Sequence, residues 1–266
     1  MRILFVGDVV GSPGRRILKS VLPRLRGELC PDLVVVNGEN AAGGNGLTPA
    51  TADEIFRAGS DVVTSGNHIW DRKEIHPYLD RHERLLRPAN YPDPAPGGGV
   101  CVLEAHDGTP TAVVNLMGRV FLAALDDPFR AADAILRELR DRARVILVDF
   151  HAEATSEKVA FGWHLDGRVA AVVGTHTHVP TADERVLPRG TAFITDVGMT
   201  GPYDSVIGVD KSLVLDRFLS QRPARFTPAT GDVRLASVVI EVSPRTGLAE
   251  SIRRLEVREE DAGGRR

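Results

Sequence analysis

Carboxylate, amide and imidazole side chains recur directly after five short apolar runs of this sequence. Oxygen and imidazole-nitrogen ligands of this kind suit borderline divalent or trivalent metal ions. No thiolate is among them, which argues against a structural zinc site. Each residue has a simpler structural explanation when it is taken singly, but their shared position predicts one metal site. The residues are Asp8, Glu39, Asn40, Asn67, His68, His151, His176 and His178.

The spacing of these residues favours two metal ions over one. His176 and His178 are two residues apart, so in extended backbone their rings point in opposite directions and each can bind its own ion. Glu39 has two carboxylate oxygens at a strand end and is the best candidate for a bridge between two ions. Asn67 and His68 are adjacent and cannot easily reach the same ion. If Asn67 binds a metal ion, His68 is left free to face a substrate.

Nine short apolar runs would form the strands that position these residues. The runs are continuous and β-branched, which favours strands buried on both faces within an α/β core. The carboxyl ends of consecutive parallel strands meet at one edge of a sheet, so the candidate ligands would be brought together there. The runs cover residues 3–6, 33–36, 61–64, 100–103, 111–115, 145–150, 169–174, 191–196 and 237–242.

Helices are expected between these runs. Three pairs, each of an N-capping residue and a proline, predict helix starts, and Gly59 predicts a helix end. An Asp-Gly turn at 107–108 predicts a hairpin, and a second antiparallel pair is expected near the C-terminus. A two-sheet sandwich or a doubly wound core fits this order, with residues 1–257 as a single domain and 258–266 as a disordered tail. The three pairs are Ser12-Pro13, Thr48-Pro49 and Asp127-Pro128.

Composition excludes several classes of protein. The 266 residues are 42% hydrophobic and carry a net charge of −3, with no basic cluster of the kind that binds long nucleic acids. No window approaches the ~18 apolar residues of a membrane span, and the N-terminal apolar run is too short for a signal peptide. Cys30 and Cys101 lack paired spacing and are expected to be buried thiols in a reducing compartment. We therefore expect a cytoplasmic protein.

Five motifs occur in an order that resembles the calcineurin-like metallophosphoesterase superfamily. They are G-D at 7–8, G-E-N at 38–40, G-N-H at 66–68, the isolated His151 and G-T-H-T-H at 174–178. The resemblance implies an α/β fold, a four-layer αββα sandwich of two mixed sheets with a dinuclear metal centre.

Two departures from the superfamily pattern narrow the resemblance. The first motif is usually D-x-H, but Val10 stands where the histidine would be. The second usually supplies a bridging aspartate, but Glu39 stands in G-E-N. Both departures, with G-M-T-G-P at 198–202 and S-V-I-G at 205–208, resemble the YmdB-like phosphodiesterases that act on 2′,3′-cyclic nucleotides.

The resemblance also implies the ligand sets and the metal. One ion would bind Asp8, Glu39, Asn40 and His178; the other would bind Glu39, Asn67, His151 and His176. Iron is implied, with manganese as the usual substitute. The oxygen-rich set would favour Fe(III), Mn(II) or Mg(II) over a soft ion.

The implied activity is hydrolysis of small phosphodiesters, most of all 2′,3′-cyclic nucleotides, with 3′,5′-cyclic nucleotides as further substrates. A metal-bridging hydroxide would attack phosphorus, and His68 would protonate the leaving ribose oxygen. Asp71 and Asp204 are the candidate partners of His68.

Three other functions compete with this one. The same centre would suit a phosphomonoesterase or protein phosphatase. A regulatory scaffold would bind metal without turnover. A Rossmann-like nucleotide-binding protein is suggested by G-D-V-V-G-S-P-G, although Val9 replaces the second glycine of the required motif.

The expected partner is a small phosphodiester or nucleotide substrate, with no long nucleic acid and no membrane, and we expect a homo-oligomer. Trp163 and His164 are candidates to line the approach of the substrate. Tyr203 is a candidate to stack on a nucleobase, although packing or an oligomer contact explains it equally well.

Overall fold

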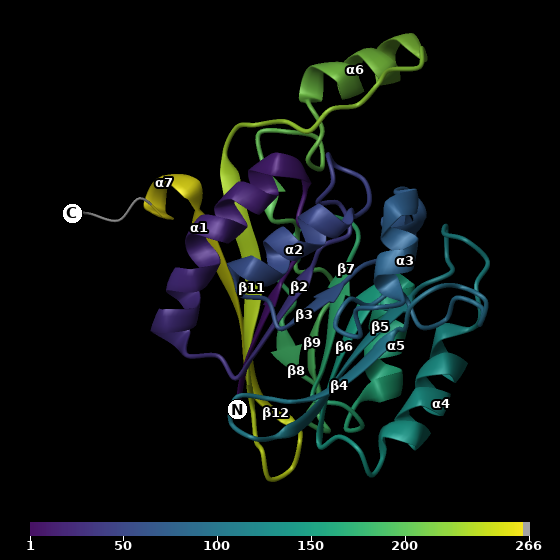
Figure 1. Ribbon diagram of the computed structural model, residues 1–266, viewed down its shortest axis with the longest axis vertical. Helices are drawn as coiled ribbons and strands as arrows, with labels where there is room; N and C mark the ends of the chain where they lie inside the picture. Colours follow the sequence, from purple (N-terminus) through teal and green to yellow (C-terminus); the bar gives the residue numbers. More distant parts are fainter. Residues whose placement is uncertain (263–266) are drawn as a thin grey trace.

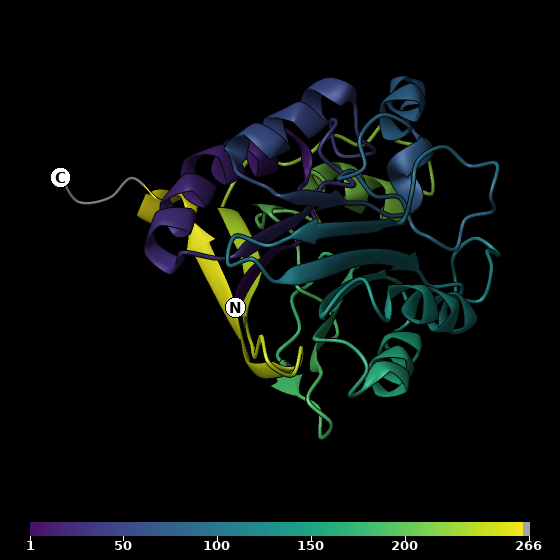
Figure 2. The ribbon, with the colours of Figure 1, turned by 60° about the horizontal axis from the view of Figure 1, so that its bottom comes forward.

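The computed structural model describes residues 1–262, and their strands form two sheets that pack face to face (Figures 1 and 2). In the first sheet, β1, β2 and β3 are parallel, and β11 runs antiparallel to β1, β10 and β12. Its strands are β1 (Arg2–Val6), β2 (Leu33–Asn37), β3 (Val62–Thr64), β10 (Gly201–Pro202), β11 (Val233–Val242) and β12 (Ala249–Arg258).

The second sheet has the order β4-β5-β6-β7-β9-β8. Its four inner strands are parallel, and the strand at each edge runs antiparallel to its neighbour. The predicted hairpin is the β4–β5 pair, and the predicted C-terminal pair is β11–β12. The strands are β4 (Val100–Glu104), β5 (Pro110–Met117), β6 (Val145–His151), β7 (Ala171–Thr175), β8 (Arg185–Val186) and β9 (Ala192–Ile194).

Helices cover the outer face of each sheet, as Figure 2 shows. Helices α1 (Gly11–Leu29) and α2 (Pro49–Ala58) pack on the first sheet, whereas α4 (Pro128–Leu139) and α5 (Thr155–Leu165) pack on the second. The four-layer αββα sandwich is therefore confirmed. The remaining helical segments are η1 (Asn67–Trp70), η2 (Lys73–Ile75), α3 (His76–Leu79), α6 (Lys211–Ser220), which stands apart from the sandwich in Figure 1, and α7 (Glu259–Ala262).

The continuous apolar runs follow from this layering. Val35 belongs to the core between the two sheets, whereas Val34 and Val36 belong to the core beneath α1 and α2. Successive side chains of a strand point to opposite faces, and here both faces are covered. Packing on both faces makes such a strand rigid, so the residue that follows it has a well-defined position.

Two of the three predicted helix starts are confirmed. Thr48 accepts a hydrogen bond from the Thr51 amide in a capping box, and Asp127 caps α4. The Ser12-Pro13 start is wrong, because α1 already begins at Gly11. The Gly11 amide donates to the Asn40 carbonyl, so backbone bonds replace a side-chain cap there.

The C-terminal segment and one cysteine differ from expectation. Where a disordered tail was expected, Arg258 ends β12 and Glu259 begins α7, held by two hydrogen bonds from the Arg16 guanidinium. Residues 263–266 lie outside the described residues. Cys101 is buried, but Cys30, the left-handed C-cap residue of α1, is exposed. Within residues 1–262 no helix is long and apolar enough to cross a membrane.

Candidate metal centre

The predicted ligands meet at the ends of strands from both sheets. The single sheet edge expected from the sequence is wrong, because β1, β2 and β3 belong to the first sheet, whereas β6 and β7 belong to the second. Asp8 follows β1, Glu39 and Asn40 follow β2, Asn67 and His68 follow β3, His151 ends β6, and His176 and His178 follow β7.

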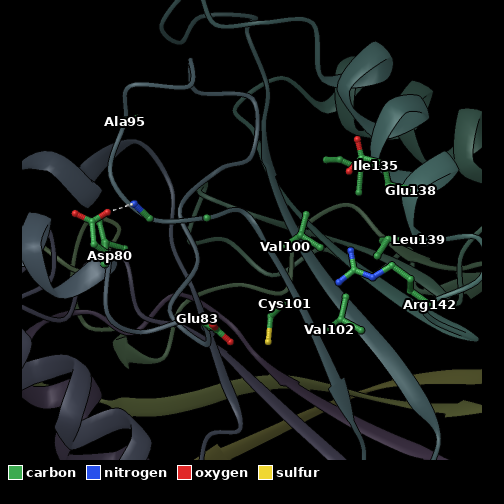
Figure 3. Close-up of a pocket in the computed structure, with 13 residues that line it drawn as sticks. Asp80, Glu83, Ala95, Val100, Cys101, Val102, Ile135, Glu138, Leu139 and Arg142 are labelled. Atoms are coloured by element: carbon green, nitrogen blue, oxygen red, sulfur yellow. Dashed lines mark hydrogen bonds between the residues drawn. The ribbon is translucent and has the colours of Figure 1, made fainter.

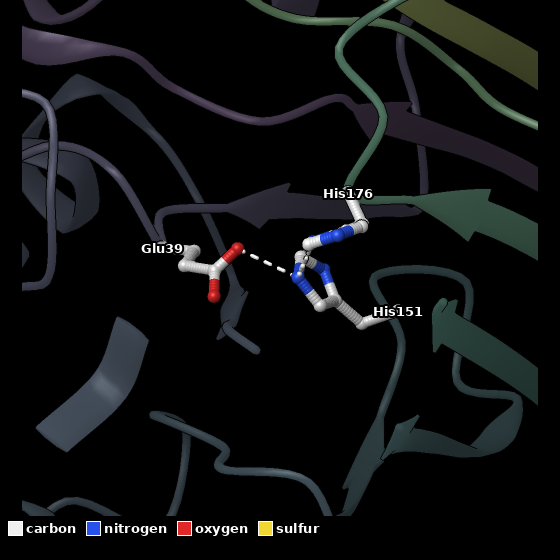
Figure 4. A group of neighbouring side chains, drawn as sticks. All are labelled: Glu39, His151 and His176. Carbon is white, nitrogen blue, oxygen red and sulfur yellow. Dashed lines mark hydrogen bonds and ion pairs between the residues drawn. The ribbon is translucent and has the colours of Figure 1, made fainter. Parts of the chain in front are cut away.

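Three candidate ligands surround one nitrogen of His151. Its Nε2 lies 2.8 Å from Oε2 of Glu39 and 3.0 Å from Nδ1 of His176. The same nitrogen lies 3.2 Å from Oδ1 of Asn67. Figure 4 shows Glu39, His151 and His176 facing one another, and their ligand atoms lie within 4.8 Å of each other. A single proton on Nε2 could serve only one of these neighbours, so the arrangement suits a metal ion.

Two buried carboxylate oxygens in the site are poorly compensated. Oδ1 of Asp8 has no hydrogen-bond partner, and Oε2 of Glu39 has only its contact with Nε2 of His151, a nitrogen that also faces Asn67 and His176. An unpartnered buried polar atom costs free energy, the more so on a charged group. The donor set and these two oxygens therefore fit a metal cofactor.

The pKa values of Glu39 and His151 show how strongly the site favours positive charge. Burial alone would raise the pKa of Glu39, but the charge of His151 brings it down to about 2. Burial would lower the pKa of His151, but Glu39 raises it to about 9. A proton on His151 thus balances Glu39 at neutral pH, and a metal ion would replace that proton. Burial, with His151 beside it, lowers the pKa of His176 to about 3, which leaves its ring neutral and able to bind a metal ion.

A chain of hydrogen bonds behind His151 fixes the orientation of its ring. The Thr175 hydroxyl donates to Oδ1 of Asp149 at 2.7 Å, so it must accept from Nδ1–H of His151 at 2.9 Å. Nε2 is thereby directed at the ligand cluster. Partners of this kind orient metal-binding histidines and raise their basicity.

Asp149 was missed in the sequence. It is fully buried, and Oδ2 accepts hydrogen bonds from Thr64 and Asn37. Burial raises the pKa of Asp149 to about 6. The available signal was a carboxylate inside the continuous apolar run that ends at His151.

His178 and Asn40 form a second group. Nδ1–H of His178 donates to the Ile207 carbonyl at 2.8 Å, so its Nε2 is free to accept from the Asn40 amide at 3.1 Å. Oδ2 of Asp8 accepts from the His176 amide at 3.3 Å, and its Oδ1 lies 3.9 Å from Nδ1 of His151.

The extended backbone expected for residues 176–178 is wrong. His176 has φ 99° and His178 has φ 66°, both left-handed. Asp196 holds this turn by accepting from the Thr177 amide at 3.1 Å and the Thr177 hydroxyl at 2.8 Å. Lys158 is buried beside it and donates to Asp196 at 2.7 Å. Sequence reasoning missed Lys158 and Asp196, although Asp196 ends an apolar run as the ligands do.

His68 lies beside the candidate ligands and lines the cavity next to them. Nδ1 lies 2.9 Å from Oδ2 of Asp71, and its amide donates to Oε1 of Glu39 at 2.7 Å. Of the two candidate partners, Asp71 is the one in contact, because Asp204 instead pairs with Lys211. This hydrogen bond from the backbone amide joins His68 directly to Glu39, the carboxylate expected to bridge two ions.

A cavity of about 420 Å³ opens beside this centre. His68, His176 and His178 line it, as does Glu153, whose carboxylate lies 2.9 Å from Nε2 of His176. A larger cavity, about 610 Å³, lies between β4 and α4 and is shown in Figure 3. Its lining includes Asp80, Glu83 and Arg142 but none of the candidate ligands. Of these two cavities, the smaller one is lined by candidate ligands and could hold a substrate next to them.

Three other predicted contacts are not made. Trp163, His164 and Tyr203 are not among the residues that line the site cavity. His164 pairs with Asp133, and the Tyr203 hydroxyl donates to the Met199 carbonyl.

A Rossmann-like phosphate site is also unavailable. The amides of Val9, Val10 and Gly11 donate to carbonyls of Asn37, Thr200 and Asn40, respectively. Amides that are already bonded cannot cradle a pyrophosphate.

Known proteins resemble this chain over most of its length. The model of the YmdB-like protein family matches residues 4–255. The 2′,3′-cyclic-nucleotide 2′-phosphodiesterase of Bacillus subtilis (strain 168) is 52% identical over 255 residues, which are 96% of each chain.

Two solved structures share the fold. A hypothetical protein from Thermus thermophilus has a TM-score of 0.92 and 46% identity, over 97% of this chain and 100% of that one. A novel phosphatase from Mycoplasma pneumoniae has a TM-score of 0.91 and 34% identity, over 97% of this chain and 93% of that one.

The Thr175→Val variant should bind metal about 10- to 100-fold more weakly, because His151 loses the acceptor that orients its ring. Competition with a chelator, followed by metal analysis, measures this affinity. Thr111→Val is the matched control, since Thr111 is equally buried and its hydroxyl donates to Thr109. Equal metal affinity in the two variants would contradict the role of Thr175.

Metal affinity should rise with pH up to about 9, the pKa of His151. Below this pH the metal-free site holds a proton on His151 that the metal must displace, so affinity should increase about tenfold per pH unit. Calorimetry in buffers of different ionisation enthalpy counts the released protons. Binding without proton release near pH 7 would show that His151 is not a ligand.

Proposed function

Because the chain belongs to the YmdB-like protein family, we propose that it is a metal-dependent phosphodiesterase whose substrates are 2′,3′-cyclic nucleotides. The observation that carries this proposal is the convergence of Glu39, His151 and His176 on one point, near the buried Oδ1 of Asp8, which lacks a hydrogen-bond partner. The related Bacillus subtilis protein supports the choice of substrate. We further propose that residues 1–257 work as a single domain.

The proposed centre holds two metal ions. Asp8, Glu39, Asn40 and His178 would bind one of them; Glu39, Asn67, His151 and His176 would bind the other. The oxygen-rich ligand set supports iron as Fe(III), with Mn(II) as the alternative. Bound cations of this kind supply a hydroxide nucleophile at neutral pH and offset negative charge on the phosphate.

His68 supplies the proton that the leaving group needs. A ribose alkoxide is a poor leaving group, and a donor in hydrogen-bond reach lowers the barrier to its departure. Nδ1 of His68 is engaged with Asp71, so Nε2 is the atom that carries the transferred proton. The contact with Asp71 orients the His68 ring.

Phosphomonoester hydrolysis on the same centre is the second candidate. The solved phosphatase from Mycoplasma pneumoniae, 34% identical to this chain, favours it. Both kinds of ester carry a phosphate group that the proposed centre would bind, and a comparison of the two substrates distinguishes the candidates.

A homo-oligomer and a cytoplasmic location remain predictions. The exposed apolar side chains of α6 support self-association, since such surfaces mark contact sites. They are Leu215, Phe218 and Leu219.

Purified protein should hydrolyse a 2′,3′-cyclic nucleotide much faster than the corresponding nucleoside monophosphate. Chelation should abolish the activity, and added Fe or Mn should restore it, because metal supplies the nucleophile. Product analysis by chromatography and metal analysis of the same samples provide the measurements. Preferred monoester turnover would select the phosphatase, and undiminished activity after complete metal removal would refute both candidates.

The His68→Ala variant should lose about 10²- to 10⁴-fold in kcat on a cyclic nucleotide. The loss should be much smaller on a 4-nitrophenyl diester, whose leaving group needs no proton, while metal content stays unchanged. His82→Ala is the control, because His82 stacks on Tyr78. Equal losses on both substrates would rule out the general-acid role.

A further inference from the structure

The site cavity has two chemically different walls. The polar wall consists of side chains of the candidate metal centre. The apolar wall consists of lining residues from the two segments that lead into and out of α6: Ile207, Val209, Phe226 and Pro228. Ile207 is 54% exposed and Phe226 is 39% exposed, although both are large apolar residues.

Ile207 occupies a backbone position that rarely holds isoleucine. Val206 and Val209 exchange backbone hydrogen bonds of 2.9 and 3.0 Å around a two-residue turn. The central residues, Ile207 and Gly208, have φ values of 47° and 97°. Turns with two positive φ values prefer asparagine, aspartate or glycine, and a β-branched residue there is an outlier.

The strained residue is tied to the metal centre. The Ile207 carbonyl accepts from Nδ1–H of His178, so the position of the turn matters for that ring. A residue of any type at position 207 could provide this backbone carbonyl, so the carbonyl does not explain why the residue is isoleucine. The isoleucine side chain adds exposed apolar surface to the cavity, and the strained backbone is the cost of placing it there.

Phe226 belongs to the segment that follows α6 and also lines the cavity. Three contacts hold this segment in place. The Asp210 amide donates to the Thr227 carbonyl at 3.0 Å, and the Ala229 amide donates to the Gly208 carbonyl at 2.9 Å. The Arg217 guanidinium lies over the Phe226 ring, 5.1 Å from its centroid. These contacts join the segment of Phe226 to the segment of Ile207, and both side chains line the cavity.

We propose that Ile207 and Phe226 form the binding surface for the nucleobase of the substrate. This rests on the proposed function: the polar wall receives the cyclic phosphate, and the apolar wall receives the flat ring attached to the same ribose. The cavity volume of about 420 Å³ falls within the range of small-molecule sites. Contact with the face of a ring accepts any base, because every base has a π-face.

Two substrates that differ only in the base test this proposal. They are adenosine 2′,3′-cyclic phosphate and methyl riboside 2′,3′-cyclic phosphate, which has no base. Phe226→Ala and Ile207→Asn should each lower kcat/KM on the adenosine substrate about 5- to 100-fold, through KM. On the riboside, kcat/KM should stay within about twofold, since no base contact is lost.

Stability and metal content separate this role from a structural one. Ile207→Asn should leave the melting temperature unchanged or raised, because asparagine tolerates the left-handed turn. Metal content should stay at the wild-type level in both variants. Leu219→Ala is the matched control, because Leu219 is 86% exposed on α6 and does not line the cavity. It should behave as wild type on both substrates.

Several outcomes would overturn the proposal. Equal losses on the two substrates would show a structural role, and unchanged KM values in both variants would place the base elsewhere. If the wild-type protein hydrolyses both substrates with equal kcat/KM, the proposed function stands and the base surface is wrong. If it hydrolyses neither while fully metal-loaded, the proposed function itself fails, and the base surface fails with it.

Discussion

Buried negative charge at the junction of two sheets is the constraint on which this structure depends. Asp8, Glu39 and Asp149 have no exposed surface, although carboxylates left buried without compensation cost several kcal/mol each. His151 lies among all three, within 2.8 Å of Glu39 and 3.9 Å of Asp8, and reaches Asp149 through Thr175. Positive charge at this point therefore stabilises the folded state. A metal ion bound here would supply that charge without a proton, and its binding would then stabilise the fold.

The sandwich makes such a cluster possible because it holds the strands on both faces. The side chains of β2 pack alternately towards the helices (Val34 and Val36) and towards the second sheet (Val35). The loop that carries Glu39 therefore starts from a rigid strand. The opposite sheet contributes the left-handed turn at residues 176–178. Buried Lys158 and Asp196 hold this turn in place, and breaking such a pair leaves an uncompensated charge. Rigid strands and a buried ion pair thus position the two halves of the site independently.

The sequence revealed what is local and missed what depends on packing. The apolar runs, the polar residue after each run, and the caps at Thr48 and Asp127 could be predicted because each depends on nearby residues. Asp149 and Lys158 could not, since a charge inside an apolar strand or helix gains its role from a partner far along the chain. The division of the ligands between two sheets was hidden for the same reason. The Ser12 cap failed because backbone carbonyls from remote loops satisfy the start of α1.

Val10, which stands where related motifs have a histidine, connects the metal centre to the shape of the cavity. Its side chain fills the space beside Gly201 and Gly208, where an added Cβ would lie within about 3.0 Å of it. Gly208 belongs to the turn that presents Ile207, so a larger side chain at position 10 would push against the apolar wall. Asn40 lies beside His178 and would supply an oxygen ligand in the proposed centre, where valine cannot bind a metal ion. Valine at position 10 would thus both make the proposed ligand set richer in oxygen and leave room for the apolar wall.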